Sequence, residues 1–274
     1  MTPLFGPPPK AETNPQKRSY LRSGEIPQKG IMLMSAKSTV EAMVTPIAGS
    51  RESGKLAEKA NKHKRGIPTP VVFQTLEEEL KPVLGYLQGA VLNAGSGSRD
   101  ITEFLLAHGA TSVDNCDVHS AIPNAIIADL TSIPRQDATY DAILCNAVLE
   151  HVQYPDRVVQ ELRRLLKPNG YLVLCIPFMQ PNHPCPDDYR RYSRQGMLEL
   201  ARVHDLEVVD IHPVHTVAQT VTWIWWAHLE EQGKRLQQIL LWGPFHLWCR
   251  FSRSTDFSFK NQANSFQAIL RKNS

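Results

Sequence analysis

The chain has 274 residues, a net charge of +3, 42% hydrophobic residues and five cysteines. This length accommodates one large domain with a substantial core. The charge is uneven: residues 1–66 carry 12 Lys and Arg against 5 Asp and Glu, whereas residues 67–274 carry 18 against 22. The second segment is therefore mildly acidic, which argues against nucleic-acid binding.

The five cysteines are scattered without a CxxC pair. This pattern argues against a disulfide framework or a structural zinc site and favours a reducing compartment. No apolar run approaches the roughly 20 residues of a membrane span, and the N-terminus lacks the apolar stretch of a secretory signal. We therefore expect a cytoplasmic protein.

Residues 1–66 are rich in Pro, Ser, Gly and Lys and contain only two aromatic residues, Phe5 and Tyr20. Such a composition cannot supply a hydrophobic core, so it predicts a basic, disordered N-terminal extension. A transit-like presequence and an over-extended start are alternatives. The folded domain is expected to span residues 67–274.

Within that domain, apolar runs alternate with segments of helical period. Residues 72–87 have helical period, and Pro82 must kink or split that helix. The expected strands are, in chain order, 90–92, 111–118, 125–129, 140–145, 170–178, 206–214 and 264–272. The further expected helices are 100–106, 156–167, stopped by Pro-Asn-Gly at 168–170, and 193–201, capped by Ser193. This order predicts an α/β fold with a Rossmann-like, doubly wound, seven-stranded and mostly parallel sheet.

Residues 215–260 interrupt the pattern between the sixth and seventh strands and contain all five tryptophans. We expect an aromatic-rich C-terminal cap insertion, and its role has three interpretations. Its aromatic helices complete the core, or they form a lid over an apolar acceptor pocket, or segment 221–251 makes a peripheral contact with a membrane interface.

The stretch Ala-Val-Leu-Asn-Ala-Gly-Ser-Gly-Ser at residues 90–98 joins the first strand to a helix. A glycine turn there allows close approach of a ligand to the backbone, and the helix N-terminus presents free N–H groups. The dinucleotide fingerprint GxGxxG/A requires a small third residue. Asp100 stands at that position, which argues against a dinucleotide ligand.

Several short motifs occur in a specific order between about residues 90 and 202: VLNAGSGS, DNCDV, ADLTSIP, YDAILCNAVLEHV, LLKPNG and YLVLCIPF. In this order and spacing they resemble the class I S-adenosylmethionine-dependent methyltransferases, most closely the type 11 group of small-molecule enzymes. The segment HPCPDDYRRYSRQGMLEL also resembles a stretch that follows the fifth strand in some members. The resemblance implies S-adenosyl-L-methionine as the cofactor.

The resemblance also assigns roles to residues at the carboxyl ends of the strands. Gly95 and Gly97 would approach the methionine moiety, Asp117 would accept hydrogen bonds from the ribose hydroxyls, and Asp129 would accept one from the adenine amino group. The full expected cofactor set is Asn93, Gly95, Ser96, Gly97, Asp117, Val118, Asp129, Leu130 and Asn146.

Two residues depart from the family pattern. Asn93 stands where the family usually has an acidic residue near the methionine amino group, and Arg99 stands at or beside the position of the third loop glycine. Arg99 would either pair with the cofactor carboxylate or point to solvent. These departures motivate an alternative function, a catalytically inactive binding protein that kept the fold.

Candidate catalytic residues lie after the fourth and fifth strands. His183 or Asp188 would act as the base that deprotonates an oxygen nucleophile, and His151 would line the site. The alternative is a polar loop in which acidic residues pair with Arg190 and Arg191. We expect no metal site, because the other histidines of the domain lack ligand spacing.

The sequence therefore predicts an S-adenosylmethionine-dependent methyltransferase that acts on a small organic acceptor, with O-methylation of a metabolite, lipid or sugar as the reaction. A third alternative is a methyltransferase with a membrane-embedded acceptor, such as a quinone precursor. The acceptor itself is not encoded in any motif that the chain carries.

Overall fold

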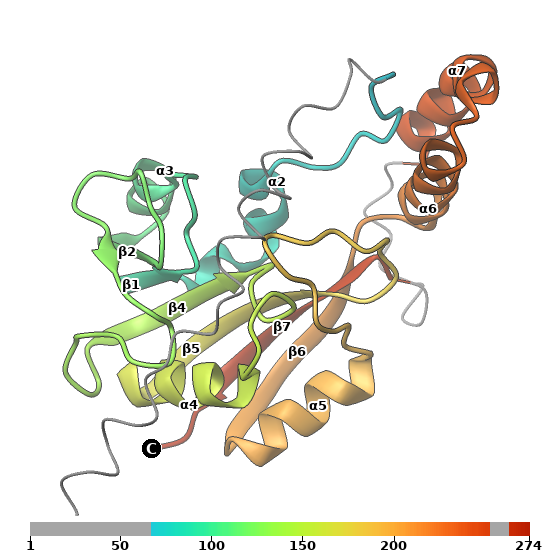
Figure 1. Cartoon of the computed structure of the whole chain (residues 1–274). Helices are drawn as coiled ribbons and strands as arrows, with labels where there is room; N and C mark the ends of the chain where they lie inside the picture. Colours follow the sequence, from blue (N-terminus) through green and yellow to red (C-terminus); the bar gives the residue numbers. More distant parts are fainter. Residues whose placement is uncertain (1–66, 253–262) are drawn as a thin grey trace, which may run out of the picture. The chain divides into compact units, whose positions relative to one another are not determined.

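The computed structural model describes residues 67–252 and 263–274; the extension expected at residues 1–66 lies outside them. A seven-stranded sheet runs through the domain in the order β3-β2-β1-β4-β5-β7-β6 (Figure 1). The strands are β1 (Gly89–Ala94), β2 (Ala110–Asp117), β3 (Ile126–Ile127), β4 (Tyr140–Asn146), β5 (Leu166–Pro177), β6 (Leu206–Val214) and β7 (Ser265–Lys272). Strand β7 pairs antiparallel with β5 and β6, and the other pairs are parallel. The predicted Rossmann-like, mostly parallel sheet is confirmed.

Helices cover both faces of this sheet (Figure 1). The helices of the described residues are α2 (Leu76–Leu80), the 3-10 helix η2 (Lys81–Tyr86), α3 (Thr102–Leu106), α4 (Pro155–Leu165), α5 (Arg194–Val203), α6 (Val217–Glu231) and α7 (Arg235–Phe251); α2, η2 and α3 pack on one face and α4 and α5 on the other. The cores on the two faces take alternate strand residues: Leu92 packs in the cluster that contains α4 and α5, and Val91 packs in the cluster that contains α2, η2 and α3. Alternation of this kind follows from the period of two in a strand.

The helix expected at residues 72–87 is shorter and divided. It begins at Leu76 because Thr75 forms a capping box, in which its hydroxyl accepts from the Glu78 amide and its own amide donates to the Glu78 carboxylate. Pro82 stands in the first turn of η2, so the α-helix gives way to a 3-10 helix at the proline.

Pro-Asn-Gly at residues 168–170 was expected to end the helix at residue 167, and this prediction is wrong. Helix α4 already ends at Leu165, because Leu166 is extended and begins β5. The three residues lie inside β5, where its pairing with β4 shifts register and Asn169 has a φ of 62°. A proline and a left-handed residue fit such a bulge because neither has to complete a regular ladder.

The third strand is also shorter than expected, Ile126–Ile127 instead of 125–129. It ends early because the Asp129 carboxylate accepts from both the amide and the hydroxyl of Thr131, which turns the chain. The helix expected at 100–106 begins at Thr102. The sixth strand, 206–214, has the expected bounds.

The predicted insertion is a pair of helices, α6 and α7, between β6 and β7. Thr216 caps α6 in a capping box with Gln219, whose side-chain amide also donates to the Val72 carbonyl at 2.6 Å. The indole of Trp242 on α7 donates to the Pro68 carbonyl. Both helices are therefore tied to the segment that precedes α2. No helix among residues 67–252 and 263–274 is long and apolar enough to cross a membrane.

Candidate active site

The turn after β1 brings the chain across the end of β2. The amides of Gly95 and Ser96 both donate to the Cys116 carbonyl, at 2.8 and 3.1 Å. Gly95 has a φ of 75°, and a Cβ there would overlap the Cγ2 atom of Val148, in the turn after β4. Only glycine satisfies both the backbone angle and this close approach.

Asp117, at the end of β2, closes this turn. One carboxylate oxygen accepts from the Gly97 amide at 2.8 Å, and the other accepts from the His119 amide at 2.9 Å. A carboxylate oxygen has two acceptor sites, so each oxygen can take a second donor. Val118, the next residue, exposes half of its apolar side chain beside this carboxylate.

Asn93 and Arg99, the two departures from the family pattern, have structural partners. Asn93 is buried, and its amide donates to the Asn115 side chain at 2.9 Å, which ties β1 to β2. Arg99 is exposed and lies 3.5 Å from the Glu77 carboxylate. Exposed pairs of this kind contribute little to stability.

Asp129 uses one carboxylate oxygen for the Thr131 turn, and Leu130 beside it is buried. By contrast, the Oγ atom of Ser96 and the Oδ1 atom of Asn146 are buried and have no hydrogen-bond partner. Both stand where the cofactor set was expected, after β1 and at the end of β4. Orphaned buried polar atoms indicate a missing ligand or water, so these residues fit a bound cofactor.

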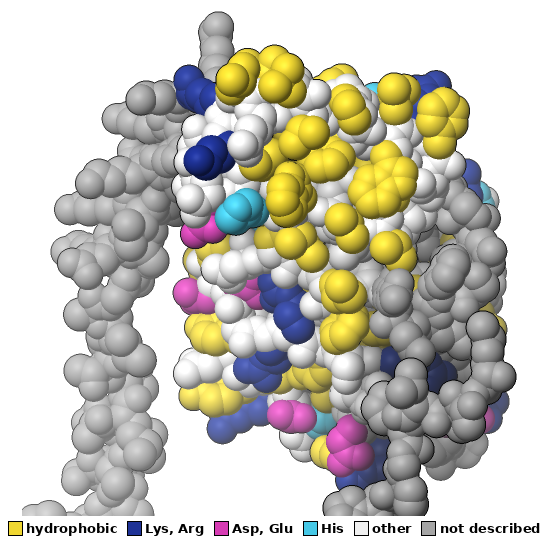
Figure 2. Space-filling model, turned by 90° about the vertical axis from the view of Figure 1, so that its right-hand side faces the viewer, with side chains coloured by type: hydrophobic (Ala, Val, Ile, Leu, Met, Phe, Trp, Pro, Cys, Tyr) yellow, Lys and Arg dark blue, Asp and Glu magenta, His cyan; other side chains and the backbone are white. Residues whose placement is uncertain are grey.

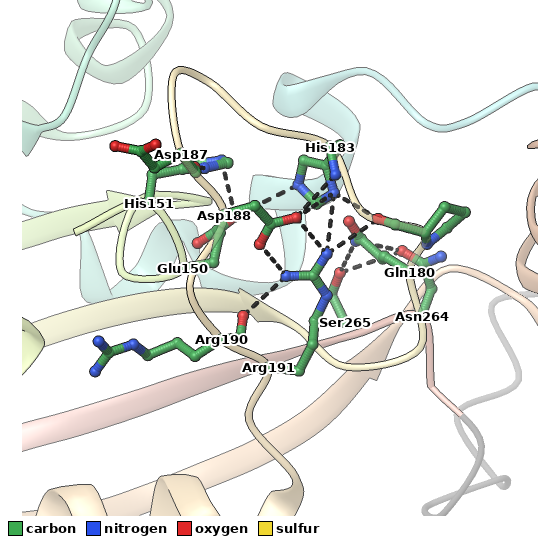
Figure 3. Close-up of polar contacts among 11 residues, drawn as sticks. Glu150, His151, Gln180, His183, Asp187, Asp188, Arg190, Arg191, Asn264 and Ser265 are labelled. Carbon is green, nitrogen blue, oxygen red and sulfur yellow. Dashed lines mark hydrogen bonds and ion pairs between the residues drawn. The ribbon is translucent and has the colours of Figure 1, made fainter. Parts of the chain in front are cut away.

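A second polar cluster lies after β4 and β5 and contains Glu150, His151 and His183 (Figure 3). Glu150 is fully buried, and neither of its carboxylate oxygens has a hydrogen-bond partner. The Nε2 atoms of His151 and His183 lie 3.6 and 4.0 Å from the same oxygen of Glu150. Burial raises the pKa of Glu150 above its usual range. One ligand atom from each of these three residues lies within 4.8 Å of the others, a grouping that suits a metal ion.

Asp188, the other expected base, is held by Arg191. The two carboxylate oxygens contact the two terminal guanidinium nitrogens, and one of them also accepts from the His183 amide at 2.8 Å. The hydrogen bonds from Arg191 hold the pKa of Asp188 below its usual range. This pairing favours the alternative in which Asp188 belongs to a polar loop and pairs with an arginine. The role of Asp188 as a base stays a prediction.

Helix α6 reaches the same cluster. The rings of His183 and Trp223 lie 5.8 Å apart, and Trp223 makes an edge contact with Phe73 at 5.3 Å. The structure thus brings His151 and His183 together, with Trp223 and Phe73 beside them. Glu150, which with His151 was expected to line the site, lies buried between the two histidines.

Comparison with known protein families gives a match to the segment that carries these site residues. Residues 92–174 match the family described as Methyltransferase domain. The segment from β1 to β5 therefore carries the sequence pattern of a methyltransferase domain. The match covers β1 to most of β5, and therefore the glycine turn, Asp117, Asp129 and Glu150. The predicted resemblance is confirmed over this segment.

Two curated relatives match the methyltransferase domain in part. Demethylmenaquinone methyltransferase of Streptomyces avermitilis is 35% identical over 75 residues, which cover 27% of this chain and 32% of the relative. Ubiquinone biosynthesis O-methyltransferase of Paraburkholderia xenovorans is 29% identical over 97 residues, which cover 30% and 41%. The chain spans less than half the length of the curated relatives it matches.

Solved structures of methyltransferases are similar at low identity. A 1,6-didemethyltoxoflavin-N1-methyltransferase of Burkholderia thailandensis, solved with its substrate and S-adenosylhomocysteine, is 14% identical with a TM-score of 0.47, covering 90% of this chain and 94% of that one. An S-adenosylmethionine-dependent methyltransferase from Archaeoglobus fulgidus is 12% identical with a TM-score of 0.48, covering 72% and 93%. Neither likeness bears on the activity.

Proposed function

We propose that the protein transfers the methyl group of S-adenosylmethionine to an oxygen atom of a small organic acceptor. One observation carries the proposal: the segment that matches a methyltransferase domain holds its glycine turn, Asp117 and a buried, unpartnered Oδ1 atom of Asn146 at one edge of the sheet. The names of the two curated relatives support the same class of reaction.

The cofactor residues would divide the ligand among the strand ends. The turn at Gly95 and Gly97 admits the amino-acid end of the cofactor, and Asp117 has acceptor capacity left for the ribose hydroxyls. Val118 and Leu130 offer apolar contacts to the adenine ring, and Asp129 has a second oxygen for its amino group. Asn146 would supply its free Oδ1 atom near the sulfur. The sulfonium carries the methyl group, so the protein has mainly to hold the two reactants in line.

The acceptor would approach from the turns after β4 and β5. An imidazole Nε2 atom of His151 or His183 is in position to accept the proton of a hydroxyl group. Trp223 and Phe73 would contact the apolar part of the acceptor, which gives α6 the role of a lid. Asp188 would position His183 through its amide rather than take a proton itself.

Calorimetry with S-adenosylhomocysteine and a turnover assay test this proposal on the full chain. We expect micromolar binding, and sustained formation of S-adenosylhomocysteine from S-adenosylmethionine in the presence of hydroxylated aromatic and lipid acceptors. Absence of binding would overturn the proposal. Binding without turnover across the acceptor panel would instead support the catalytically inactive alternative.

The surface of α7 favours a second candidate, a methyltransferase whose acceptor lies in a membrane. Only Gln238 and Cys249 of α7 are buried. Its exposed apolar residues join those of α6 in one patch, seen in the upper part of Figure 2. The patch contains Val221, Ile224, Trp225, Leu236, Ile239, Leu240, Leu247, Trp248 and Phe251. Helix α7 has no acidic residue and carries Arg235 and Arg250 near its ends, so an anionic bilayer complements it.

Liposome flotation tests this candidate. We expect the wild type to float with vesicles that contain anionic lipid, and Leu236→Ser/Leu240→Ser/Phe251→Ser to stay in solution. The matched control is Val203→Ser/Val209→Ser, which removes exposed apolar side chains from α5 and β6. Trp226 is buried and Trp223 packs against Phe73, so both are left unchanged. Equal behaviour of wild type and triple variant would remove this candidate.

A further inference from the structure

The carboxyl group of Glu150 is buried without any hydrogen-bond donor. Its side chain has no solvent exposure, and neither oxygen receives a hydrogen bond. A buried carboxylate without a donor costs several kcal/mol, on the order of the cost of an unpaired buried ion. In such a place Glu150 stays ionised only where a positive charge compensates it, and two histidines flank it.

The two histidines are oriented as metal ligands. His151 Nδ1 lies 2.6 Å from the Asp187 carbonyl, and His183 Nδ1 lies 2.9 Å from the Pro181 carbonyl. Because a carbonyl oxygen only accepts, each Nδ1 atom carries the proton, and each Nε2 atom is left with a lone pair that faces Glu150. Metal-binding histidines are oriented by such outer hydrogen bonds.

Arg191 also approaches His183 Nδ1, at 3.3 Å. Its guanidinium already donates to the Pro181 carbonyl and to Asp188. The Asp188 carboxylate lies 3.7 Å from the same Nδ1 atom, and its negative charge favours a proton there. These neighbours therefore support the tautomer with a free Nε2.

The distances fit a cation of moderate size. The chosen ligand atoms lie within 4.8 Å of one another, and ligands of a tetrahedral zinc ion at bond lengths of about 2.0–2.2 Å lie about 3.4 Å apart. Small side-chain rotations close that difference. Two imidazoles and one carboxylate form a ligand set found in zinc sites that keep one position open.

We propose that Glu150, His151 and His183 bind one divalent cation of the zinc type, with an open position toward the acceptor. Resting on the proposed methyl transfer, the inference assigns this position to the acceptor hydroxyl. The cation lowers the pKa of that hydroxyl and its proton passes to water. The oxygen then forms the new bond to the methyl carbon, while the electron pair of the broken carbon–sulfur bond stays on sulfur and yields S-adenosylhomocysteine. In this form the imidazoles are ligands, and the cation takes over the task of a general base.

Titration of the chelator-treated full chain with Zn²⁺, Co²⁺ and Mg²⁺ tests the site. We expect one Zn²⁺ per chain, and Co²⁺ absorption bands typical of a four- or five-coordinate ion. Glu150→Gln and His183→Ala should each weaken binding about 100-fold or more, whereas Mg²⁺ should bind weakly because it prefers oxygen ligands. The matched control, His204→Ala, removes a histidine that pairs with Asp156 at the surface and should bind like the wild type.

Circular dichroism confirms that each variant is folded before its affinity is compared. Absence of a bound ion, or equal affinity in wild type and Glu150→Gln, would overturn the metal site. Binding of S-adenosylhomocysteine to the metal-free protein is measured in parallel. If that binding and turnover persist without metal, the metal inference alone fails; if metal binds and S-adenosylhomocysteine does not, the proposed function alone fails.

Discussion

The two halves of the sheet's carboxyl edge differ in how their polar side chains are paired. After β1, β2 and β3, the carboxylates of Asp117 and Asp129 and the amide of Asn93 all have partners within the protein. After β4 and β5, Asn146 and Glu150 keep buried atoms without partners. Apart from the Ser96 hydroxyl, the first half is preorganised, whereas the second half needs a ligand to complete it.

The largest expected effect comes from removing the unpaired group of the second half. Glu150→Leu should lower turnover about 100-fold or more, with little change in affinity for S-adenosylhomocysteine. In the metal-free protein the same change should raise the free energy of unfolding by about 1–3 kcal/mol, because an apolar side chain replaces a buried carboxyl group whose oxygens have no hydrogen-bond partner. Steady-state kinetics and chemical denaturation measure the two effects. A variant that is both less stable and less active would indicate that Glu150 is structural.

In the first half, the corresponding change should affect the cofactor instead. Asp117→Ala removes charge-assisted hydrogen bonds and should weaken S-adenosylhomocysteine binding by about 30-fold. The control is Asp114→Ala, because Asp114 also lies on β2 but bonds Arg135 and Tyr140. Calorimetry compares the two, and equal affinities would contradict the ribose role of Asp117.

At the carboxyl edge of the sheet, the close approach of Gly95 to Val148 joins the two halves, so the next prediction tests their coupling. Gly95→Ala should cost about 2–4 kcal/mol, from the strain of a positive φ and from overlap with Val148. Adding Val148→Ala should remove the overlap and regain that part of the stability, but the strain of the positive φ at residue 95 should remain. Gly97→Ala is the matched control, because Gly97 has a φ of 56° with open space around its Cβ position, and should cost about 1 kcal/mol. Urea denaturation of the wild type, Gly95→Ala, Val148→Ala and the double variant gives the coupling energy; a value near zero would show that the two turns are independent.

The smallest effect concerns an acid–base pair outside the site whose two members are largely buried. Glu79 and His215 lie 3.4 Å apart at the base of α6. Burial raises the pKa of Glu79 to about 7 and lowers the pKa of His215 to about 4. Stability from Glu79 is therefore present below its unfolded pKa of 4.5 and lost as the pH rises through 7. Stability from His215 is present above 6.5 and lost as the pH falls through 4.

These opposite slopes should nearly cancel between pH 5 and 7 in the wild type. Glu79→Gln should leave stability that rises with pH by roughly 1–2 kcal/mol over this range, and His215→Asn should leave stability that falls by a similar amount. Asparagine is chosen because residue 215 has a φ of 65°, which asparagine tolerates. Thermal unfolding at several pH values measures the slopes. Slopes of the same sign in both variants would refute the compensation.

The strands could be predicted because buried parallel strands are nearly continuous apolar runs. The ends of the elements could not, because side-chain hydrogen bonds set them: Thr75 delays α2, and Asp129 shortens β3. At the site, Gly95 and Asp117 were recognisable since each follows a strand at a characteristic distance. The partnership of Asp188 with Arg191 depends on how the loop folds, and the sequence left it as one of two interpretations.

The chemical role of Glu150 could not be assigned from the sequence, for a physical reason. Its burial arises from tertiary packing, when the loop after β5 covers the turn after β4 and the Tyr189 amide donates to the Glu150 carbonyl at 2.8 Å. The sequence offered one signal, a glutamate and a histidine side by side directly after a buried strand. The unpartnered state of its carboxylate can be recognised only in three dimensions.

The point at which the connection with α6 and α7 leaves the sheet and returns to it has a consequence for how such a protein can diverge. Strand β6 ends at Val214 and β7 begins at Ser265, and these two residues are register partners. The chain therefore leaves β6 and enters β7 at paired positions. The segment between these two strands can be replaced by one of another length without a change in their register. The aromatic wall formed by Trp223 and Phe73 beside His183 is thus carried in part by a replaceable segment; if the proposed function holds, the acceptor can change while the residues after β1, β2 and β3 stay the same.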